Sequence, residues 1–377
     1  MRSRRFVLGT WCALIATVFT GCKKDTPAPP PGGGGSAAAP APSAGSKRIV
    51  ILTNGDDPFW DTCEAGAKQA EIDLGLKGKG FTVAFERPEF SDQSQIDKLK
   101  QYNLQSDIAA LGISIFNPES RALAEELKQL QDKGVKVITI DGDISREKFR
   151  DRRYAYLGTD NIVAGRELGK ASKALIGGDG ATKHAFFVGS TDAANAVARM
   201  TGFNEGIGQA SQEVDRLEDS ADRPKARANV ESALDRHAGL NALVGIWAYN
   251  TPQIVSVVTD RKIGDKAKVL CFDAAEASIR GMQDGNVDVM LVQNPFQMGF
   301  DGVKLMLALA TDDEAVQKEM YPSYAQSDEN DMFKTELRVV VPDSETKVTA
   351  ELLEKETKLM KFSEFKKWLE DRKLVSS

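Results

Sequence analysis

The sequence has 377 residues, of which 41% are hydrophobic and 28% are charged, and its net charge is −6. This balance is typical of a globular protein and leaves enough length for two domains. The acidic excess argues against a basic surface suited to nucleic acid.

The first 21 residues are expected to form a signal peptide. Arg2, Arg4 and Arg5 precede a mostly apolar run over residues 6–19, which is too short for a mature membrane span. The segment ends in Gly21-Cys22, which resembles a bacterial lipobox. We therefore expect cleavage of residues 1–21 and lipidation of Cys22. Ordinary secretion with cleavage elsewhere is the alternative.

Residues 22–46 are expected to form a flexible linker. They are rich in Pro, Gly, Ala and Ser, and such a composition cannot bury a core. A flexible linker directly after a lipidated cysteine suits a soluble domain that is held near a membrane.

Strands and helices are expected to alternate from residue 47 onward. The run Ile49–Leu52 predicts a buried strand, because it is short, rich in β-branched residues and closed by Gly55 and Pro58. Further strands are expected at 81–85, 109–116, 135–140, 154–158, 184–188, 214–218, 242–248, 268–272, 287–292 and 337–341. After the helix that follows the first strand, further helices are expected at 95–104, 119–133, 162–176, 195–211, 224–237, 251–260, 276–284, 296–310 and 351–372. This alternation predicts an α/β fold of doubly wound parallel sheets.

Many of the expected strands are followed by a polar residue that can bind a hydroxyl group. These residues are Asp57, Asn117, Asp141, Asn250, Asp273 and Gln293. In open parallel sheets, ligands bind beyond the carboxyl ends of the strands. Carboxylates accept hydrogen bonds from hydroxyls, and amide side chains both donate and accept. With the aromatic residues Phe59, Trp60 and Trp247 nearby, the pattern predicts a site for a small polyhydroxylated ligand.

A structural interpretation competes with this one. Asn and Asp also begin turns and cap helices after strands, and aromatic residues after a strand commonly cover the sheet. For any single position the structural interpretation is the stronger one. For six positions together it is strained, because caps would also use Ser and Thr.

The segments that carry these residues resemble, in order and spacing, the type I sugar-binding proteins of ABC transporters, the family of the periplasmic ribose-binding protein. The resemblance extends from about Lys47 to Val341. The matching segments are Asp57-Pro58-Phe59-Trp60, Phe116-Asn117-Pro118, residues 137–141, residues 158–161, residues 195–199 with Gly202-Phe203, residues 247–250, residues 271–273 and residues 293–295.

The resemblance implies two doubly wound lobes that are joined by a three-strand hinge and close on a ligand. It places lobe 1 at residues 47–159 plus 294–335, and lobe 2 at residues 160–293 plus 336–377, with an extra C-terminal helix. It also implies which residues bind the ligand: Asp57, Phe59, Trp60, Asn117, Asp141, Asn195, Trp247, Asn250, Asp273 and Gln293.

The function implied by the resemblance is that of a receptor, not an enzyme. The protein would capture a monosaccharide or related polyol and deliver it to an ABC permease. It would be a monomeric lipoprotein in the periplasm or at the cell surface. No cofactor, metal or nucleic acid is implied. Only two histidines and no C-x-x-C motif are present, which argues against a zinc site.

Three departures from the family pattern concern the pocket. Gly142 and Val197 stand where the family often has arginines, and Asp57 replaces an asparagine. The missing cations argue against ribose as the ligand but leave the ligand class unchanged. We expect Arg199 to pair within lobe 2.

Three other classes of protein are alternatives to a transport receptor. An enzyme is not supported, because no nucleophile elbow, P-loop or dinucleotide fingerprint is present, although paired aspartates such as Asp141 and Asp273 also occur in glycoside hydrolysis. A sugar-responsive transcription regulator would need a helix-turn-helix where the signal peptide and linker stand. A sensory receptor that presents sugar to a chemotaxis or kinase partner differs only in its partner and stays open.

Overall fold

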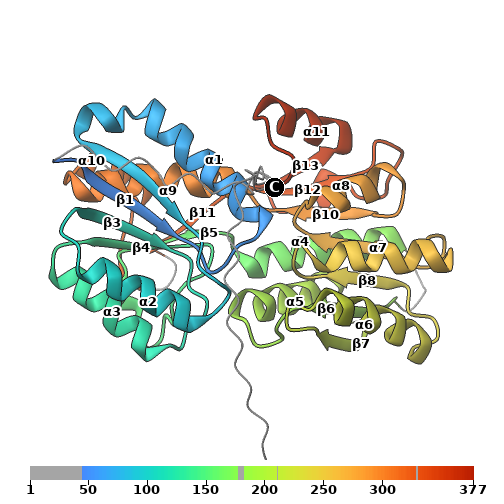
Figure 1. Ribbon diagram of the computed structural model, residues 1–377. Coiled ribbons are helices and arrows are strands. Elements are labelled where there is room, and N and C mark those ends of the chain that lie inside the picture. Colours follow the sequence, from blue (N-terminus) through green and yellow to red (C-terminus); the bar gives the residue numbers. More distant parts are fainter. Residues whose placement is uncertain (1–44, 177–181, 210, 328–329) are drawn as a thin grey trace, which may run out of the picture. The chain divides into compact units, whose positions relative to one another are not determined.

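The computed structural model describes residues 45–176, 182–209, 211–327 and 330–377. Within these residues the chain forms two sheets, each flanked by helices (Figure 1). The strand order is β11-β5-β4-β3-β1-β2 in the first sheet and β13-β12-β10-β9-β8-β6-β7 in the second. The expected α/β fold with two doubly wound lobes is therefore confirmed. One strand, β12, runs antiparallel to its neighbour β10, so the second sheet is not wholly parallel.

The first lobe surrounds the first sheet. Its strands are β1 (Lys47–Leu52), β2 (Phe81–Glu86), β3 (Ile108–Ile113), β4 (Lys136–Ile140), β5 (Tyr156–Gly158) and β11 (Met332–Lys334). One face packs against α1 (Pro58–Asp73), α9 (Pro295–Ala310) and α10 (Glu314–Met320). The other face packs against α2 (Asp92–Asn103) and α3 (Arg121–Asp132).

The second lobe surrounds the second sheet. Its strands are β6 (Thr182–Val188), β7 (Ser211–Glu218), β8 (Ala242–Gly245), β9 (Lys268–Phe272), β10 (Val289–Val292), β12 (Leu337–Val341) and β13 (Thr357–Lys361). Helices α4 (Asn161–Ile176) and α5 (Ala194–Ile207) cover one face. Helices α6 (Arg223–Arg236), α7 (Asn250–Arg261), α8 (Glu276–Gln283) and α11 (Phe362–Asp371) cover the other.

The apolar runs in the sequence follow from burial on both faces of each sheet. In β1, Ile49 and Ile51 pack in the cluster with α1 and α9, whereas Val50 and Leu52 pack in the cluster with α2 and α3. Successive side chains of a strand point to opposite faces. A strand with helices on both faces therefore needs apolar residues at consecutive positions.

The chain passes between the two sheets three times: after β5, after β10 and between β11 and β12. The three crossings are hydrogen-bonded to one another. Thr159 Oγ1 donates to Gln293 Oε1 at 2.7 Å, and Thr335 N donates to the Gly158 carbonyl at 2.9 Å. The two lobes are therefore joined by three segments of the chain that lie side by side.

The helix expected over residues 351–372 is wrong in its first half. Residues Thr357–Lys361 form β13, which pairs in parallel with β12, and only Phe362–Asp371 is helical. The reason lies in the packing. Leu353 and Leu359 face the cluster around α4 and α5, whereas Phe365 lies in the cluster on the opposite face of the sheet. A single helix would have kept these apolar residues on one side.

Candidate ligand-binding site

Asp141 and Asp273 occupy matching places in the two lobes. Each follows its strand directly, Asp141 after β4 and Asp273 after β9. Both have a positive φ, 63° and 65°, a backbone conformation that aspartate tolerates better than most residues. The side chains are 9% and 6% exposed. The two carboxyl groups thus lie at the carboxyl ends of the two sheets, where parallel sheets bind ligands.

The structure brings three of the predicted aspartates close enough to interact electrostatically. The pKa of Asp141 is raised to about 7, mainly by burial; Arg199 opposes the increase, and the carboxylates of Asp273 and Asp57 add to it. Burial also raises the pKa of Asp57, and Asp273 adds to this shift. Since each carboxylate hinders ionisation of another, the three form one acidic cluster.

Asp57 also has a structural role at the start of α1. Its Oδ1 accepts a hydrogen bond from Phe59 N at 2.9 Å, so it caps the helix. This bond fixes the side chain at the end of the helix that follows β1. The cap therefore holds one carboxylate of the acidic cluster in place.

Asp273 is held by Gln293 and Arg199. Gln293 Nε2 donates to Asp273 Oδ1 at 2.6 Å, and Arg199 Nη1 lies 3.7 Å from Asp273 Oδ2. Arg199 also donates to Asn161 Oδ1 and to the Ile246 carbonyl. These partners of Arg199 all belong to elements around the second sheet. Because Gln293 also accepts from Thr159, Asp273 is connected through Gln293 to two of the crossings between the lobes.

The carboxylate of Asp141 receives no hydrogen bond from any of the described residues, although its backbone carbonyl accepts one from the Tyr156 hydroxyl at 3.1 Å. The next residue cannot supply a donor. A Cβ on Gly142 would lie 2.8 Å from the Ile115 carbonyl oxygen, so an arginine does not fit there without movement of the loop after β3. A carboxylate that is mostly buried is costly to ionise when it lacks hydrogen-bond donors, and a ligand with hydroxyl groups would supply them.

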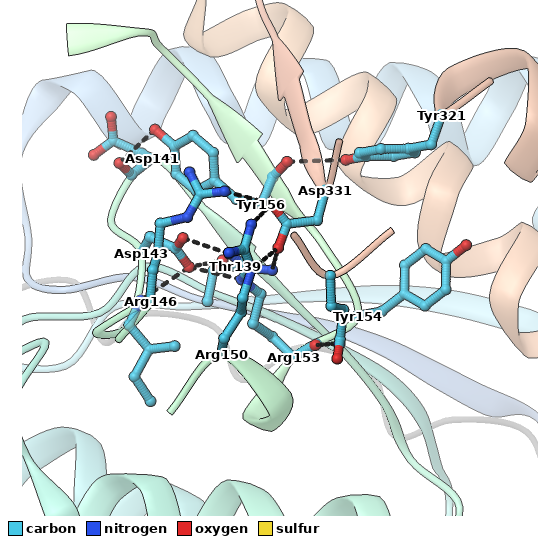
Figure 2. A network of polar contacts seen from close by, with 12 residues as sticks. Thr139, Asp141, Asp143, Arg146, Arg150, Arg153, Tyr154, Tyr156, Tyr321 and Asp331 are labelled. Atoms are coloured by element: carbon cyan, nitrogen blue, oxygen red, sulfur yellow. Dashed lines mark hydrogen bonds and ion pairs between the residues drawn. The ribbon is translucent and has the colours of Figure 1, made fainter. Parts of the chain in front are cut away.

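A buried ion-pair network supports the loop that begins at Asp141 (Figure 2). Asp331, which is fully buried, accepts from Arg146, Arg150 and Arg153. Arg153 also donates to Asp143 at 2.7 Å. Burial alone would raise the pKa of Asp331, but hydrogen bonds from Arg150 and Arg153 lower it. The network ties the loop after β4 to the start of β11.

Three predicted ligand residues have their polar atoms engaged within the protein. Trp60 is 2% exposed, and its indole N–H donates to Asn54 Oδ1. Asn117 Oδ1 accepts from Glu119 N. Asn250 donates to Asp219 Oδ2 at 2.8 Å and accepts from Trp247 N. These bonds fit the structural interpretation of turns and caps, and ligand contacts by the three residues stay predictions.

The other three predicted residues are partly exposed. Phe59 lies edge-on to Trp60, with ring centroids 5.0 Å apart. Asn195 lies in the first turn of α5. Trp247 packs on Gly189, where a Cβ would lie 2.1 Å from its ring. The Trp247 indole N–H is buried and has no acceptor among the described residues.

The sequence analysis missed Asp219. This residue follows β7 directly, is fully buried, and accepts hydrogen bonds from Tyr249 and Asn250. Asp219 comes directly after the strand expected at 214–218, so the pattern of polar residues after strands is the signal that indicates it. Asp219 fixes the turn that carries Trp247 and Asn250.

Other features of the described residues do not point to a second site. Two surface hollows, of about 390 and 480 Å³, are lined by residues such as Gln131 and Lys366 and contain none of the predicted ligand residues. No group of three or more metal-ligating side chains is placed to hold a metal ion within the described residues. The helices in the part of the chain that the structure describes are too short or too polar to span a membrane.

Two doubly wound lobes, connected by three crossings and bearing polar residues at their strand ends, define a two-lobed binding protein. The sequence matches the family model of the periplasmic binding protein domain over residues 48–314. The chain therefore belongs to the periplasmic binding protein family, which confirms the resemblance seen in the sequence.

Individual relatives are distant. The D-allose-binding periplasmic protein of Escherichia coli is 21% identical over 289 residues, covering 74% of this chain and 90% of that protein. The ribose import binding protein RbsB of Salmonella typhimurium is 24% identical over 269 residues, covering 68% and 82%. The crystal structure of an ABC transporter solute-binding protein from Burkholderia graminis, in complex with D-arabinose, has a TM-score of 0.67 and 23% identity, covering 84% of this chain and all of that one.

Proposed function

We propose that the protein is a substrate-binding lipoprotein that captures a monosaccharide or related polyol between its lobes and delivers it to an ABC permease. The carboxylate of Asp141 is the observation that carries this proposal. It is buried, lacks a donor among the described residues and lies in a cluster with Asp57 and Asp273. A ligand with several hydroxyl groups supplies the donors that the cluster needs.

The relatives support a sugar as the ligand and binding as the activity. The names of the relatives describe allose, ribose and arabinose binding, and none of them describes an enzyme. Binding is coupled to closure about the three crossings, which divide the chain into lobe 1 (47–159 plus 294–335) and lobe 2 (160–293 plus 336–377). A ligand shifts the population toward the closed form only by its preference for that form.

A thermal-unfolding panel on the full-length protein tests the proposal. The panel contains D-allose, D-ribose, D-arabinose, other hexoses and pentoses, polyols, inositols, amino acids and nucleosides. A ligand at about one hundred times its Kd stabilises by about 2.7 kcal/mol, which raises the midpoint by several degrees. A shift with amino acids or nucleosides alone would contradict the ligand class, and no shift with any compound would contradict the proposal.

Asp273→Asn is expected to weaken binding of the sugar found in the panel by at least about tenfold, because the neutral amide is a poorer acceptor for ligand hydroxyls. Asparagine tolerates the positive φ at this position, so the variant should stay folded. Isothermal titration calorimetry measures the affinity. Asp265→Asn, at an exposed position of the same lobe, is the matched control. Equal affinity in Asp273→Asn and wild type would remove Asp273 from the site.

The proposed anchor, Cys22, lies outside the described residues, as do the signal peptide and most of the linker. Cys22→Ser is expected to release the protein from the membrane fraction, because the lipid is attached through the thiol. Cell fractionation followed by immunoblotting checks this, with Cys63→Ser as a control at a buried cysteine of the first lobe. Membrane retention of Cys22→Ser would contradict the anchor.

A further inference from the structure

The segment Leu374–Ser377, called the C-terminal strap below, follows α11 and lies against both lobes. Lys373, with a φ of 55°, turns the chain at the end of the helix, and Leu374 N donates to the Leu369 carbonyl. The side chain of Leu374 packs on the core of the second lobe. Val375 is 70% exposed, but Ser376 and Ser377 are only 5% and 3% exposed.

The strap is bonded to the two loops that carry Asp273 and Gln293. Ser377 N donates to the Ala274 carbonyl at 3.1 Å, and Ala274 N donates to the Ser377 carbonyl at 2.7 Å. Ser377 Oγ also donates to the Gln293 carbonyl at 3.3 Å. Ala274 follows Asp273 directly, so the strap pairs with the backbone next to a predicted ligand residue.

The strap also contacts the first lobe. Thr62 Oγ1 on α1 donates to the Ser376 carbonyl at 2.9 Å, and Thr62 is almost fully buried. Near this contact, the guanidinium of Arg372 lies 5.8 Å from the ring centroid of Phe296 at the start of α9. Thr62 lies on the helix that Asp57 caps. The strap is therefore bonded to the elements that hold Asp57, Asp273 and Gln293.

These hydrogen bonds join the two lobes in addition to the three segments of the chain that cross between them. A buried backbone carbonyl or N–H needs a partner. When the lobes bend about the crossings, α1 moves relative to the loop after β9. The bond from Thr62 to Ser376 must then break, or the strap must move with α1.

We propose that the C-terminal strap is a latch between the lobes at the ligand site. It holds the loop after β9, called the Asp273 loop, and bonds it to α1, so that ligand binding and the relative position of the lobes are coupled. The role of the latch in ligand release rests on the proposed sugar-binding function. Its effect on lobe position does not.

Two substitutions test the latch at different bonds. Thr62→Val removes the hydroxyl donor while keeping the shape of the side chain, and Thr62→Ser keeps the hydroxyl. Ser377→Pro removes the N–H that bonds to Ala274. Val375→Thr changes an exposed side chain of the same segment and serves as the control. All variants are made in the full-length protein.

The first readout needs no ligand. Distances between spin labels on α2 and α6 report lobe position, and hydrogen exchange of residues 270–276 reports the Asp273 loop. Thr62→Val should broaden the distance distribution, and Ser377→Pro should speed exchange of the loop, while Thr62→Ser and Val375→Thr behave like wild type. Wild-type distances in Thr62→Val and wild-type exchange in Ser377→Pro would together overturn the proposal.

The second readout is the dissociation rate of D-allose, D-ribose or D-arabinose, whichever binds the wild-type protein. Loss of one buried hydrogen bond predicts release that is about fivefold faster in Thr62→Val. Unchanged release in Thr62→Val and Ser377→Pro would overturn the coupling to ligand. Failure of all three sugars to bind the wild type would count against the proposed ligand class, whereas the ligand-free distances and exchange would still decide the latch.

Discussion

Asp331→Asn is expected to lower the free energy of unfolding by about 3–5 kcal/mol, because the substitution takes a carboxylate away from the buried guanidinium of Arg153. Asp331 is fully buried and bonded to Arg146, Arg150 and Arg153. Of these, the side chain of Arg153 is itself fully buried, and among the described residues Asp143 is the ionic partner that it would keep. Removing a buried partner costs far more than removing an exposed one, since the remaining charge cannot reach water.

Urea denaturation at pH 7 measures this change. For a chain of 377 residues, the loss should lower the thermal midpoint by about 4 to 6 °C. Asp235→Asn, which removes an exposed partner of Arg261, should leave the midpoint unchanged. Because the pKa of Asp331 is lowered in the folded state, its contribution is present above about pH 4 and is lost at lower pH. Equal stability of Asp331→Asn and wild type would show that the network does not hold the loop.

The strand ends are the part of the fold that the sequence predicted well. The expected strand at 268–272 matches β9 in both bounds, and β4 ends at Ile140 as expected. The residues directly after them, Asp141 and Asp273, are close enough to interact electrostatically. The physical reason is that a strand buried on both faces gives a strong local signal, and the topology of doubly wound sheets brings the strand ends together.

Hydrogen bonds between side chains of different elements were the feature that the sequence could not predict. Trp60 and Asn250 follow strands as the other predicted ligand residues do, but Trp60 is buried in the core and Asn250 is bonded to Asp219. The side chain that competes for a polar atom lies on another element, and no local pattern reports it. The bond from Thr62 to Ser376 spans 314 positions of the chain and has no sequence signal for the same reason.

The end of the chain shows how tertiary packing overrides a local pattern. Leu359, Phe362 and Phe365 are three residues apart, which fits one amphipathic helix, but Leu359 and Phe365 lie on opposite faces of the second sheet. The backbone of residues Thr357–Lys361 pairs with β12 instead. Helix propensity is a weak preference, and a free sheet edge outweighs it.

Asp141→Asn is expected to stabilise the ligand-free protein at pH 8 and to weaken its ligand binding. Burial raises the pKa of Asp141 from 3.8 to about 7, so the folded state binds a proton more tightly than the unfolded state does. The contribution of Asp141 to stability is therefore fully present below pH 4 and is lost as the pH rises through 7. Raising the pKa from 3.8 to about 7 corresponds to about 4 kcal/mol of stability lost at high pH, and the amide variant does not lose it.

The difference between Asp141→Asn and wild type isolates this group from the others that titrate. The pKa of His184 is lowered by burial, so its protonation removes stability as the pH falls below 6.5, which is opposite in sign to the Asp141 contribution. His184 is the same in both proteins and cancels in the difference. Midpoints measured between pH 4 and 8 should diverge as the pH rises, while Asp97→Asn, at an exposed position of α2, stays parallel to wild type. Parallel curves for Asp141→Asn would mean that the carboxylate ionises without cost, and the unsatisfied acceptor that supports a hydroxyl-rich ligand would then be absent.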